Sequence, residues 1–416
     1  MRLVITALCG LMTGLFMIPT ALAAATTKND WAPADTVVPK KYIIKYKPDI
    51  NALERELHEA NVNVKARNGG QRGIVAGFGM PGLQGYIVEI PSSELADLVQ
   101  QSDLIEYIEK DTIAKVAVAD ITPPTPKRAM TSQYNAPWGL ARVSHRTRDH
   151  WDHYYYDSSA GKDVRVYVLD TGIRTTHAEF ADGGGGGRAE WGANFVAGSP
   201  DADEAGHGTH VTGVVAGVTY GVAKRATVVA VKVLGRGGGM SGLLQGLDWA
   251  VADARQRGAA GRTVINMSLS GAYTQSVNDG VSAATDAGLI VVAAAGNDNG
   301  SAAEWSPASA PSAITVGAID RDDRRAGFSN WGAAVEIFAP GGGIASAYNS
   351  SDSATATMTG TSMAAPHVAG LAAYFIAMDG LSGSLAVTER ILDVATKGVG
   401  DPRGAADRIG YSADGA

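Results

Sequence analysis

Three short segments of this chain carry an acid, a base and a hydroxyl, the groups that acyl-transfer chemistry needs. Asp170 lies in Val-Leu-Asp-Thr-Gly, His207 begins His-Gly-Thr-His, and Ser362 lies in Gly-Thr-Ser-Met-Ala-Ala-Pro-His. A serine hydroxyl attacks an amide carbonyl only when a base takes its proton, and a carboxylate can orient that base. The segments therefore predict Ser362 as the nucleophile, His207 as the general base and Asp170 as the orienting carboxylate.

The same chemistry needs hydrogen-bond donors for the negative charge that develops on the carbonyl oxygen. Asn297, in Ala-Ala-Ala-Gly-Asn, offers a side-chain amide, and a helix that starts at Ser362 would offer a backbone N–H. Each residue also has a structural alternative, Ser362 as a helix cap and Asp170 and Asn297 as turn residues. The occurrence of these three residues together with His207 favours catalysis.

A second histidine, His210, raises the alternative of a metal site with His207. The two histidines are three residues apart, no glutamate lies between them, and no third ligand is evident. We therefore predict that His210 is a packed residue on the helix His207–Gly217 and that the chemistry needs no cofactor.

Composition and the first residues limit the class of protein. The formal net charge of −7 provides no basic stripe, so a nucleic-acid partner is not expected. The apolar run Leu3–Leu22 follows an arginine and ends in Ala-Leu-Ala, which predicts a secretory signal peptide at 1–23, with a membrane anchor as the alternative. The only cysteine, Cys9, lies in this run, so an exported protein would have no disulfide bonds. No later segment has 18 uninterrupted apolar residues, so no membrane association is expected once the signal is removed.

A doubly wound parallel sheet is predicted to position the candidate residues. Short β-rich runs alternate with helical patterns, which is typical of a parallel sheet with helices on both faces. Asp170 would then follow a strand at the carboxyl edge, where ligands of such folds bind. Strands are expected at Val164–Leu169, Thr227–Leu234, Thr263–Met267 and Leu289–Ala294, and helices at His207–Gly217, Ser241–Gln256, Ser276–Ala287 and Ser362–Met378.

A smaller α+β unit is predicted ahead of this sheet, at residues 40–118. Its order is interpreted as β-α-β-β-α-β, which is the ferredoxin-like arrangement. A proline-rich stretch within 119–134 predicts an extended linker, Gly183–Gly187 predicts a surface loop, and 401–416 is expected to be a loosely held tail. In the small unit, strands are expected at Lys41–Tyr46, Gln84–Ile90 and Asp103–Asp111, and helices at Asn51–Ala60 and from Ser92 or Ser93.

These motifs resemble those of the subtilisin-like serine proteases, most closely the proteinase K-like branch. The order Asp, His, Ser is the subtilisin order, and the Gly-x-Ser-x-Gly string of lipases and esterases does not surround Ser362. Val264–Leu269, with the sequence Val-Ile-Asn-Met-Ser-Leu, and Phe328–Gly332, with the sequence Phe-Ser-Asn-Trp-Gly, add to a likeness that covers Asn135–Met378.

The resemblance implies a domain organisation and a function. It implies a catalytic domain at 135–400, preceded by an inhibitory propeptide at 40–118 that is removed by a cut within 119–134. The expected function is a secreted, monomeric serine endopeptidase that forms an acyl-enzyme, acts on polypeptide substrates and is made as a precursor inhibited by its own propeptide. A catalytically inactive peptide-binding protein of the same fold and a serine esterase are the alternatives.

The resemblance also assigns substrate-binding segments. In such enzymes an extended substrate pairs with two backbone stretches, a form of strand addition. The residue before the scissile bond would enter a pocket lined by Ala293–Gly296, including Ala294 and Gly296, whose small residues predict a preference for apolar or aromatic side chains. The matching backbone stretches here contain Gly237, Gly238, Gly239 and Met240, and Ser268, Leu269, Ser270 and Gly271.

A structural calcium ion is a further implication. Relatives bind calcium with two backbone carbonyls and an aspartate, and the matching positions are Pro311, Ala313 and Glu336. Glutamate is also a hard oxygen ligand, although its extra methylene changes the geometry. A surface carboxylate without a metal is the alternative for Glu336.

Overall fold

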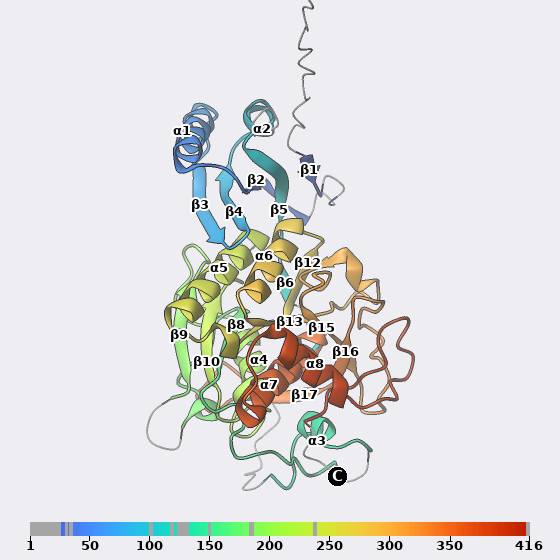
Figure 1. The fold of residues 1–416 in the computed structure, drawn as a ribbon. Coiled ribbons are helices and arrows are strands. Elements are labelled where there is room, and N and C mark those ends of the chain that lie inside the picture. The colour runs from blue at the N-terminus through green and yellow to red at the C-terminus, as the bar shows by residue number, and fades with distance from the viewer. Residues whose placement is uncertain are drawn as a thin grey trace, which may run out of the picture.

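The computed structural model describes residues 26–29, 32, 36–99, 103–116, 120–122, 133–148, 151–182, 187–235 and 239–412 (Figure 1). A small N-terminal α/β unit packs on a larger α/β unit. The predicted signal peptide at 1–23 and most of Gly183–Gly187 lie outside the described residues.

The larger unit is built on a seven-stranded sheet in which every neighbouring pair of strands is parallel. This confirms the predicted doubly wound sheet, and the four predicted strands are found within two residues of their expected ends. Three strands had not been located from sequence: the edge strands β9 (Ala189–Asn194) and β16 (Ile337–Pro340) and the inner strand β15 (Ile314–Ile319). Of these, β9 has the sequence Ala-Glu-Trp-Gly-Ala-Asn, with no run of apolar β-formers. In spatial order the strands are β16 (Ile337–Pro340), β15 (Ile314–Ile319), β13 (Ile290–Ala294), β11 (Thr263–Met267), β8 (Arg165–Asp170), β10 (Thr227–Lys232) and β9 (Ala189–Asn194).

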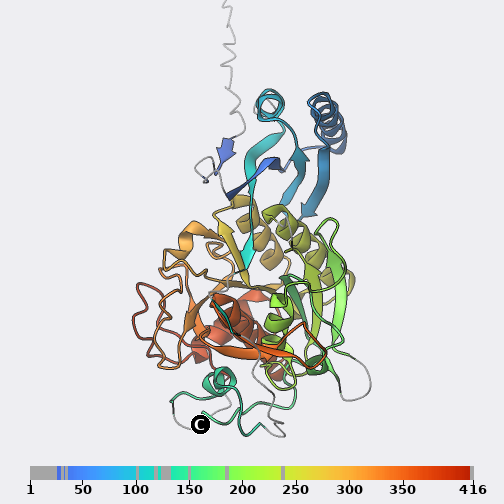
Figure 2. The same cartoon turned by 180° about the vertical axis from the view of Figure 1, so that it is seen from behind.

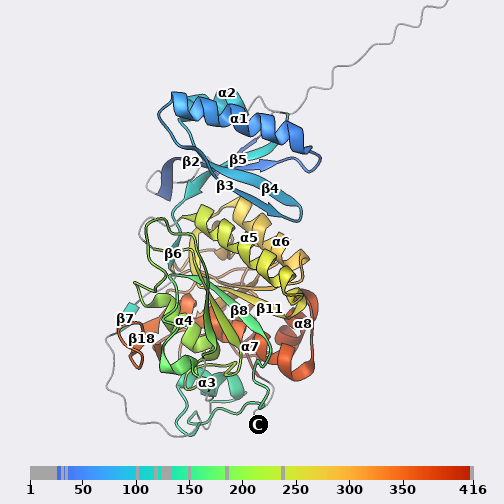
Figure 3. The ribbon, with the colours of Figure 1, turned by 90° about the vertical axis from the view of Figure 1, so that its left-hand side faces the viewer.

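Helices cover both faces of this sheet (Figure 3). Alternate residues of β8 divide between the two faces: Val166 and Val168 join the hydrophobic cluster beneath α4 and α7, and Tyr167 and Leu169 join the cluster beneath α5 and α6. The first face carries α4 (His207–Ala216), α7 (Thr361–Asp379) and α8 (Ser384–Val394), and the second carries α5 (Met240–Gln256) and α6 (Gln275–Asp286).

The helix α7 is apolar around its whole circumference because neighbours surround it. Among the described residues it is the one helix long and apolar enough to cross a membrane, and 89% of its apolar window is buried inside the protein. It contacts α4, α8 and the strands β11, β13 and β15. Its hydrophobicity therefore serves the core of this unit.

The N-terminal unit has the predicted chain order β-α-β-β-α-β. Its sheet order β1-β5-β2-β4-β3 places β5 and β4 on either side of β2, and β1 (Thr26–Lys28) adds an edge strand. Asn51 and Glu54 form a capping box at the start of α1, which continues past its predicted end at Ala60. The elements are β2 (Val37–Tyr46), α1 (Ala52–Asn68), β3 (Gly73–Met80), β4 (Leu83–Glu89), α2 (Ser92–Val99) and β5 (Ile105–Thr112), of which the glycine-rich β3 had not been located from sequence.

The sheet of the N-terminal unit is sandwiched between its own helices and the helices α5 and α6 of the larger unit (Figures 1 and 3). One face packs on α1 and α2 around a core that includes Ile44, Val62 and Tyr86. Phe78 and Met80 on the other face join the hydrophobic cluster of α5 and α6. The two units therefore share one continuous apolar interface.

Two small antiparallel sheets connect the units along the chain. After β5, the strand β6 (Lys115–Val116) pairs with β12 (Leu269–Ala272), and further on β7 (Asp120–Thr122) pairs with β18 (Thr355–Thr359) (Figure 3). The described elements also include β14 (Trp305–Ser306), which pairs with β12, β17 (Ile344–Ala347), which pairs with β18, and α3 (Trp138–Ser144).

The C-terminal segment corrects one expectation. The sequence predicts a loosely held tail at 401–416, but Ile409 is fully buried and Tyr411 is 3% exposed. The backbone of Ile409 bonds to Thr396, and the N–H of Ser412 donates to the carbonyl of Val143. Small and polar composition suggested a free end, whereas a few apolar residues are enough to anchor the segment to the core.

Candidate active site

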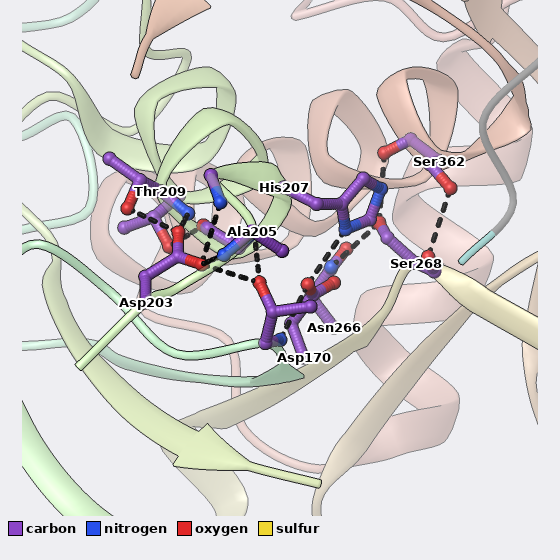
Figure 4. A network of polar contacts seen from close by, with 12 residues as sticks. Asp170, Asp203, Ala205, His207, Thr209, Asn266, Ser268 and Ser362 are labelled. Carbon is purple, nitrogen blue, oxygen red and sulfur yellow. Dashed lines mark hydrogen bonds and ion pairs between the residues drawn. The ribbon is translucent and has the colours of Figure 1, made fainter. Parts of the chain in front are cut away.

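Asp170 and His207 meet at the carboxyl edge of the parallel sheet. Asp170 is the last residue of β8 and is fully buried, and His207 is the first residue of α4 and is 4% exposed. The Nδ1 atom of His207 lies 2.7 Å from Oδ1 of Asp170, which also accepts the backbone N–H of Thr171 at 2.7 Å (Figure 4). The carboxylate therefore fixes the orientation of the imidazole.

Glycines at the start of α4 permit this approach. Gly206 precedes the helix with φ of +83°, a left-handed conformation that favours glycine. A Cβ atom at Gly208 would lie 2.1 Å from the carbonyl oxygen of Gly172, closer than any side-chain carbon can come. The helix therefore packs directly on the backbone that follows Asp170.

Ser362, the second residue of α7, is joined to Ser268 by two hydrogen bonds. Pro366 has no N–H for the carbonyl of Ser362, and the hydroxyl of Ser268 donates to that carbonyl at 2.8 Å instead. In return the hydroxyl of Ser362 donates to the carbonyl of Ser268 at 2.9 Å. The proline inside the helix thus creates the acceptor that ties the serine to the strand edge.

The imidazole of His207 lies between Asp170 and Ser362 (Figure 4). Its Nε2 atom is buried and has no hydrogen-bond partner among the described residues. The hydroxyl of Ser362 would have to turn from Ser268 to reach Nε2, and catalytic hydrogen bonds are often loose in the absence of substrate. The structure thus brings together the three residues predicted from sequence.

Asn297 follows β13 and presents a free amide donor beside the serine. Its Oδ1 accepts from both the backbone N–H and the hydroxyl of Thr361, each at 2.9 Å. Because two donors face the oxygen, the amide group is oriented, and its Nδ2 is buried without a partner among the described residues. A buried amide donor next to Ser362 is the group that a developing oxyanion needs.

Asp203 is a site residue that the sequence analysis did not identify. It is 8% exposed, and its Oδ1 accepts from the hydroxyl of Thr171 at 2.8 Å and the backbone N–H of Gly206 at 2.8 Å. Its Oδ2 accepts from the backbone N–H and hydroxyl of Thr209, at 2.9 and 2.6 Å (Figure 4). Asp203 therefore joins the residue after Asp170 to the start of α4. No capping signal marks this role in the sequence, because the N-cap residue of α4 is Gly206 and Asp203 lies three residues before it.

The predicted substrate-binding stretches contact a segment of the chain itself. Ser270 pairs with Lys115 and Leu269 with Val116, and Ile113 forms an antiparallel bridge with Gly239. These contacts involve the predicted stretches Ser268–Gly271 and Gly239–Met240. Gly237 and Gly238 lie outside the described residues.

The segment Ala293–Gly296 lies beside the serine, as its predicted role as a pocket wall requires. Ala294 ends β13, and the N–H of Gly296 donates to the hydroxyl of Thr361 at 3.1 Å. Gly296 has φ of +97°, and a Cβ atom there would lie 2.4 Å from Nδ2 of Asn330. A side chain at this position would collide with Asn330, whose Nδ2 donates to the carbonyl of Ala295.

His210, which was considered as a metal ligand, is a packed residue of the core. His210 is fully buried, its Nε2 lies 3.0 Å from the carbonyl of Ile344, and burial lowers its pKa to about 3, which fits a packed neutral histidine. Among the described residues no group of three or more His, Cys, Asp and Glu could hold a metal.

The predicted calcium ligands include backbone carbonyls. Pro311, Ala313 and Glu336 line one cavity, and Oε2 of Glu336 is buried without a hydrogen-bond partner among the described residues. Burial raises the pKa of Glu336, while the positive charge of Arg408 opposes this shift. An unpartnered carboxylate near backbone carbonyls fits the oxygen donors that Ca²⁺ prefers.

Fold and site together describe an α/β protein with a serine, a histidine and an aspartate at the carboxyl edge of a parallel sheet. A sequence model of the subtilase family matches residues 161–411. The chain is 41% identical to "Subtilisin-like protease 3" of Pseudogymnoascus destructans, with 96% of each chain covered, and 40% identical to "Alkaline protease 1" of Aspergillus clavatus, with 95% of this chain and 96% of the relative covered. The chain belongs to the subtilase family of serine proteases.

A solved structure agrees with this assignment. The crystal structure of a cold-adapted subtilisin-like serine proteinase is 39% identical in sequence and matches with a TM-score of 0.62, covering 67% of this chain and 98% of the other. The fold is therefore subtilisin-like.

Proposed function

We propose that this protein is a serine endopeptidase in which Ser362 is the nucleophile, His207 the general base and Asp170 the residue that orients the histidine. One observation carries the proposal: a fully buried carboxylate binds Nδ1 of the imidazole, and Nε2, beside the serine, has no partner within the described part of the chain. A histidine held in this way presents one tautomer to the serine, and the carboxylate stabilises the imidazolium that forms.

In the proposed reaction the hydroxyl of Ser362 turns from Ser268 toward His207. Its proton passes to Nε2 as Oγ bonds to the substrate carbonyl carbon, and an electron pair of the carbonyl moves to the oxygen. The Nδ2 of Asn297 and the N–H of Ser362 donate to this oxygen. When the intermediate collapses, the C–N bond breaks and the imidazolium gives its proton to the amine; water then cleaves the acyl-enzyme by the same steps.

A peptidyl phosphonate with an apolar side chain next to phosphorus tests this assignment. We expect a covalent adduct on Ser362 of the processed protein, located by mass spectrometry, and hydrolysis of amide substrates as well as esters. Ser362→Ala should abolish the adduct and lower amide hydrolysis by several orders of magnitude. Processed wild-type protein that binds peptides but forms no adduct would support the inactive peptide-binding alternative.

The N-terminal unit is proposed to be an inhibitory propeptide. The strand β6 occupies the edge of β12, and Ile113 bridges to Gly239, where a substrate strand is expected to pair. After residues 117–119, β7 pairs with β18, which ends at Thr359, three residues before Ser362. A segment that lies on both sides of the serine would exclude substrates.

The precursor is proposed to cut itself between Val116 and Asp120, the described residues on the two sides of the nucleophile. This interval overlaps only the beginning of 119–134, within which the cut was expected from sequence. Mass spectrometry of the processed protein should then find the new N-terminus within this interval, and Ser362→Ala protein produced without other proteases should remain uncut. Efficient maturation of that variant would contradict self-processing. A cut in the proline-rich stretch that follows would mean that β6 and β7 are not the scissile region.

Secretion and specificity complete the proposal. The apolar run at the N-terminus supports export of the precursor, and the protein is proposed to act outside the cell as a monomer. The small residues of Ala293–Gly296 support a preference for apolar or aromatic residues before the scissile bond. A peptide library in which cleavage after Lys or Arg dominates would contradict this preference.

A structural calcium ion is proposed for the cavity lined by Pro311, Ala313 and Glu336. The two carbonyls and the free Oε2 atom would hold the ion, whose charge would compensate that of the buried carboxylate. The ion has no role in the proposed reaction.

A further inference from the structure

Three side chains on one face of β5 form hydrogen bonds with the larger unit. Tyr107, Glu109 and Asp111 alternate along the strand, so all three point the same way, and none is more than 3% exposed. The hydroxyl of Tyr107 donates to Oδ2 of Asp279 at 2.8 Å. The two carboxylates bind the starts of the helices α6 and α5.

Glu109 binds the start of α6. One carboxylate oxygen accepts the backbone N–H of Gln275 at 2.6 Å, and the other accepts the backbone N–H and the hydroxyl of Ser276 at 2.8 and 2.6 Å. Thr274, which precedes the helix, makes no side-chain cap bond of its own. The carboxylate therefore supplies the capping acceptors that α6 lacks.

Asp111 binds the start of α5 in the same manner. Its carboxylate accepts the backbone N–H of Ser241 at 3.0 Å and the hydroxyl of Ser241 at 2.6 Å, and it also pairs with Lys41 of the N-terminal unit at 3.1 Å. Gly239, the residue before this helix, has no side chain with which to cap it. Both helices thus depend on acids from the N-terminal unit for their first N–H groups.

The two helix starts lie directly upstream of the substrate cleft. The strand that carries Glu109 and Asp111 continues into the bridge between Ile113 and Gly239 and then into the pairing of β6 with β12. Any extended chain that entered the cleft along this path would pass both helix starts. Release of the N-terminal unit would leave their N–H groups and hydroxyls without these carboxylates.

We propose that the processed enzyme uses these helix starts to select protein substrates with acidic residues upstream of the cleaved bond. The upstream site consists of the donors of Ser241, Gln275 and Ser276, and it binds carboxylates two residues apart on an extended segment. This inference rests on the proposed endopeptidase function. It adds a contact several residues from the scissile bond, and this contact favours binding and leaves the chemical step unchanged.

Two matched peptides test the inference on the processed wild-type enzyme. The parent peptide has the sequence of residues 105–122 with a fluorophore and a quencher at its ends; the test peptide carries Glu109→Gln and the control peptide Glu106→Gln. Glu106 is exposed and points to the opposite face of β5 from Glu109. Both changes remove one charge. We expect KM to rise about three- to tenfold for the test peptide, with kcat unchanged, and to stay constant for the control.

The outcomes separate this inference from the function on which it rests. Equal KM values for test and control peptides would overturn the upstream site while leaving the endopeptidase intact. Failure to cleave any peptide or protein would instead contradict the proposed function. An equal rise in KM for both substitutions would show a general attraction between charges and would also overturn the site.

A variant enzyme provides the reciprocal test. Ser276→Asp places a carboxylate at the start of α6, where it stabilises the helix and competes for the same N–H groups. We expect this variant to cleave the parent and test peptides with the same KM. Ser158→Asp, at an exposed position before β8, adds the same charge and should keep the difference between them. If Ser276→Asp protein fails to mature, the comparison of peptides on the wild-type enzyme still decides the question.

Discussion

Asp203 holds the two catalytic segments together although it has no direct contact with the reacting atoms. It accepts hydrogen bonds from Thr171, which follows Asp170, and from Gly206 and Thr209 around the start of α4. Asp203→Asn would place an amide N–H₂ opposite some of these donors. We expect a loss of about 1–3 kcal/mol in stability and a lower kcat with a smaller change in KM.

Asp201→Asn is the matched control, because Asp201 is exposed and accepts a single bond from the side chain of Asn194. Thermal unfolding and steady-state kinetics of both variants check the prediction. If Asp203→Asn retained the wild-type kcat and melting temperature, Asp203 would not position the histidine.

The proposed calcium site depends on the carboxylate of Glu336, so a substitution there tests it. Its Oε2 atom has no partner among the described residues, so a bound ion should stabilise the folded protein. We expect a chelator to lower the melting temperature of the wild-type protein and to have little further effect on Glu336→Gln. Glu389→Gln, at an exposed position on the same cavity, should respond to chelator as the wild type does. A melting curve that chelator leaves unchanged in the wild type would argue against the site.

At the scale of elements, the close packing of α4 on the loop after β8 sets the distance between His207 and Asp170. A Cβ atom at Gly208 would collide with the backbone carbonyl of Gly172, which cannot move without displacing Asp170. We expect Gly208→Ala to destabilise the protein by about 1–3 kcal/mol and to lower kcat sharply. Gly327→Ala, where the added carbon meets no atom within 4 Å, should be close to neutral in both measurements.

The sequence predicted those elements whose apolar pattern is continuous. The central strands β8, β10, β11 and β13 are buried on both faces and are rich in Val, Ile, Leu and Ala, without the glycine that interrupts β3, β9 and β15. The edge strand β9 and the glycine-rich β3 lack continuous apolar runs, and in the missed inner strand β15 Thr315 and Gly317 interrupt the apolar pattern.

The residues of the candidate site also divide into those that the sequence predicted and those that it did not. Asp170, His207 and Ser362 were found because each lies in a motif with its own chemistry. Asp203 was not found, because its bonds to Thr171, Gly206 and Thr209 exist only in the folded loop and the N-cap residue of α4 is Gly206. The partner of Ser362, the hydroxyl of Ser268, follows only from a helix that contains Pro366.

At the scale of the whole molecule, buried neutral histidines make stability depend on pH. Burial lowers the pKa of His210 to about 3 and that of His367 to about 4, from an ordinary value of 6.5. Below pH 6.5 the unfolded chain takes up protons that the folded protein cannot accept, so stability falls as the pH decreases from about 6.5 to about 4. Each histidine contributes at most about 1.4 kcal/mol per pH unit in this range.

Urea unfolding of processed enzyme blocked with a phosphonate, which prevents self-digestion, measures this slope between pH 7 and pH 4.5. His210→Gln and His367→Asn keep a donor near the nitrogens that face the carbonyls of Ile344 and Met363, and each should make the slope shallower. Stability that stays constant over this range would mean that the two core histidines are protonated at little cost, which is incompatible with their burial away from any described carboxylate partner.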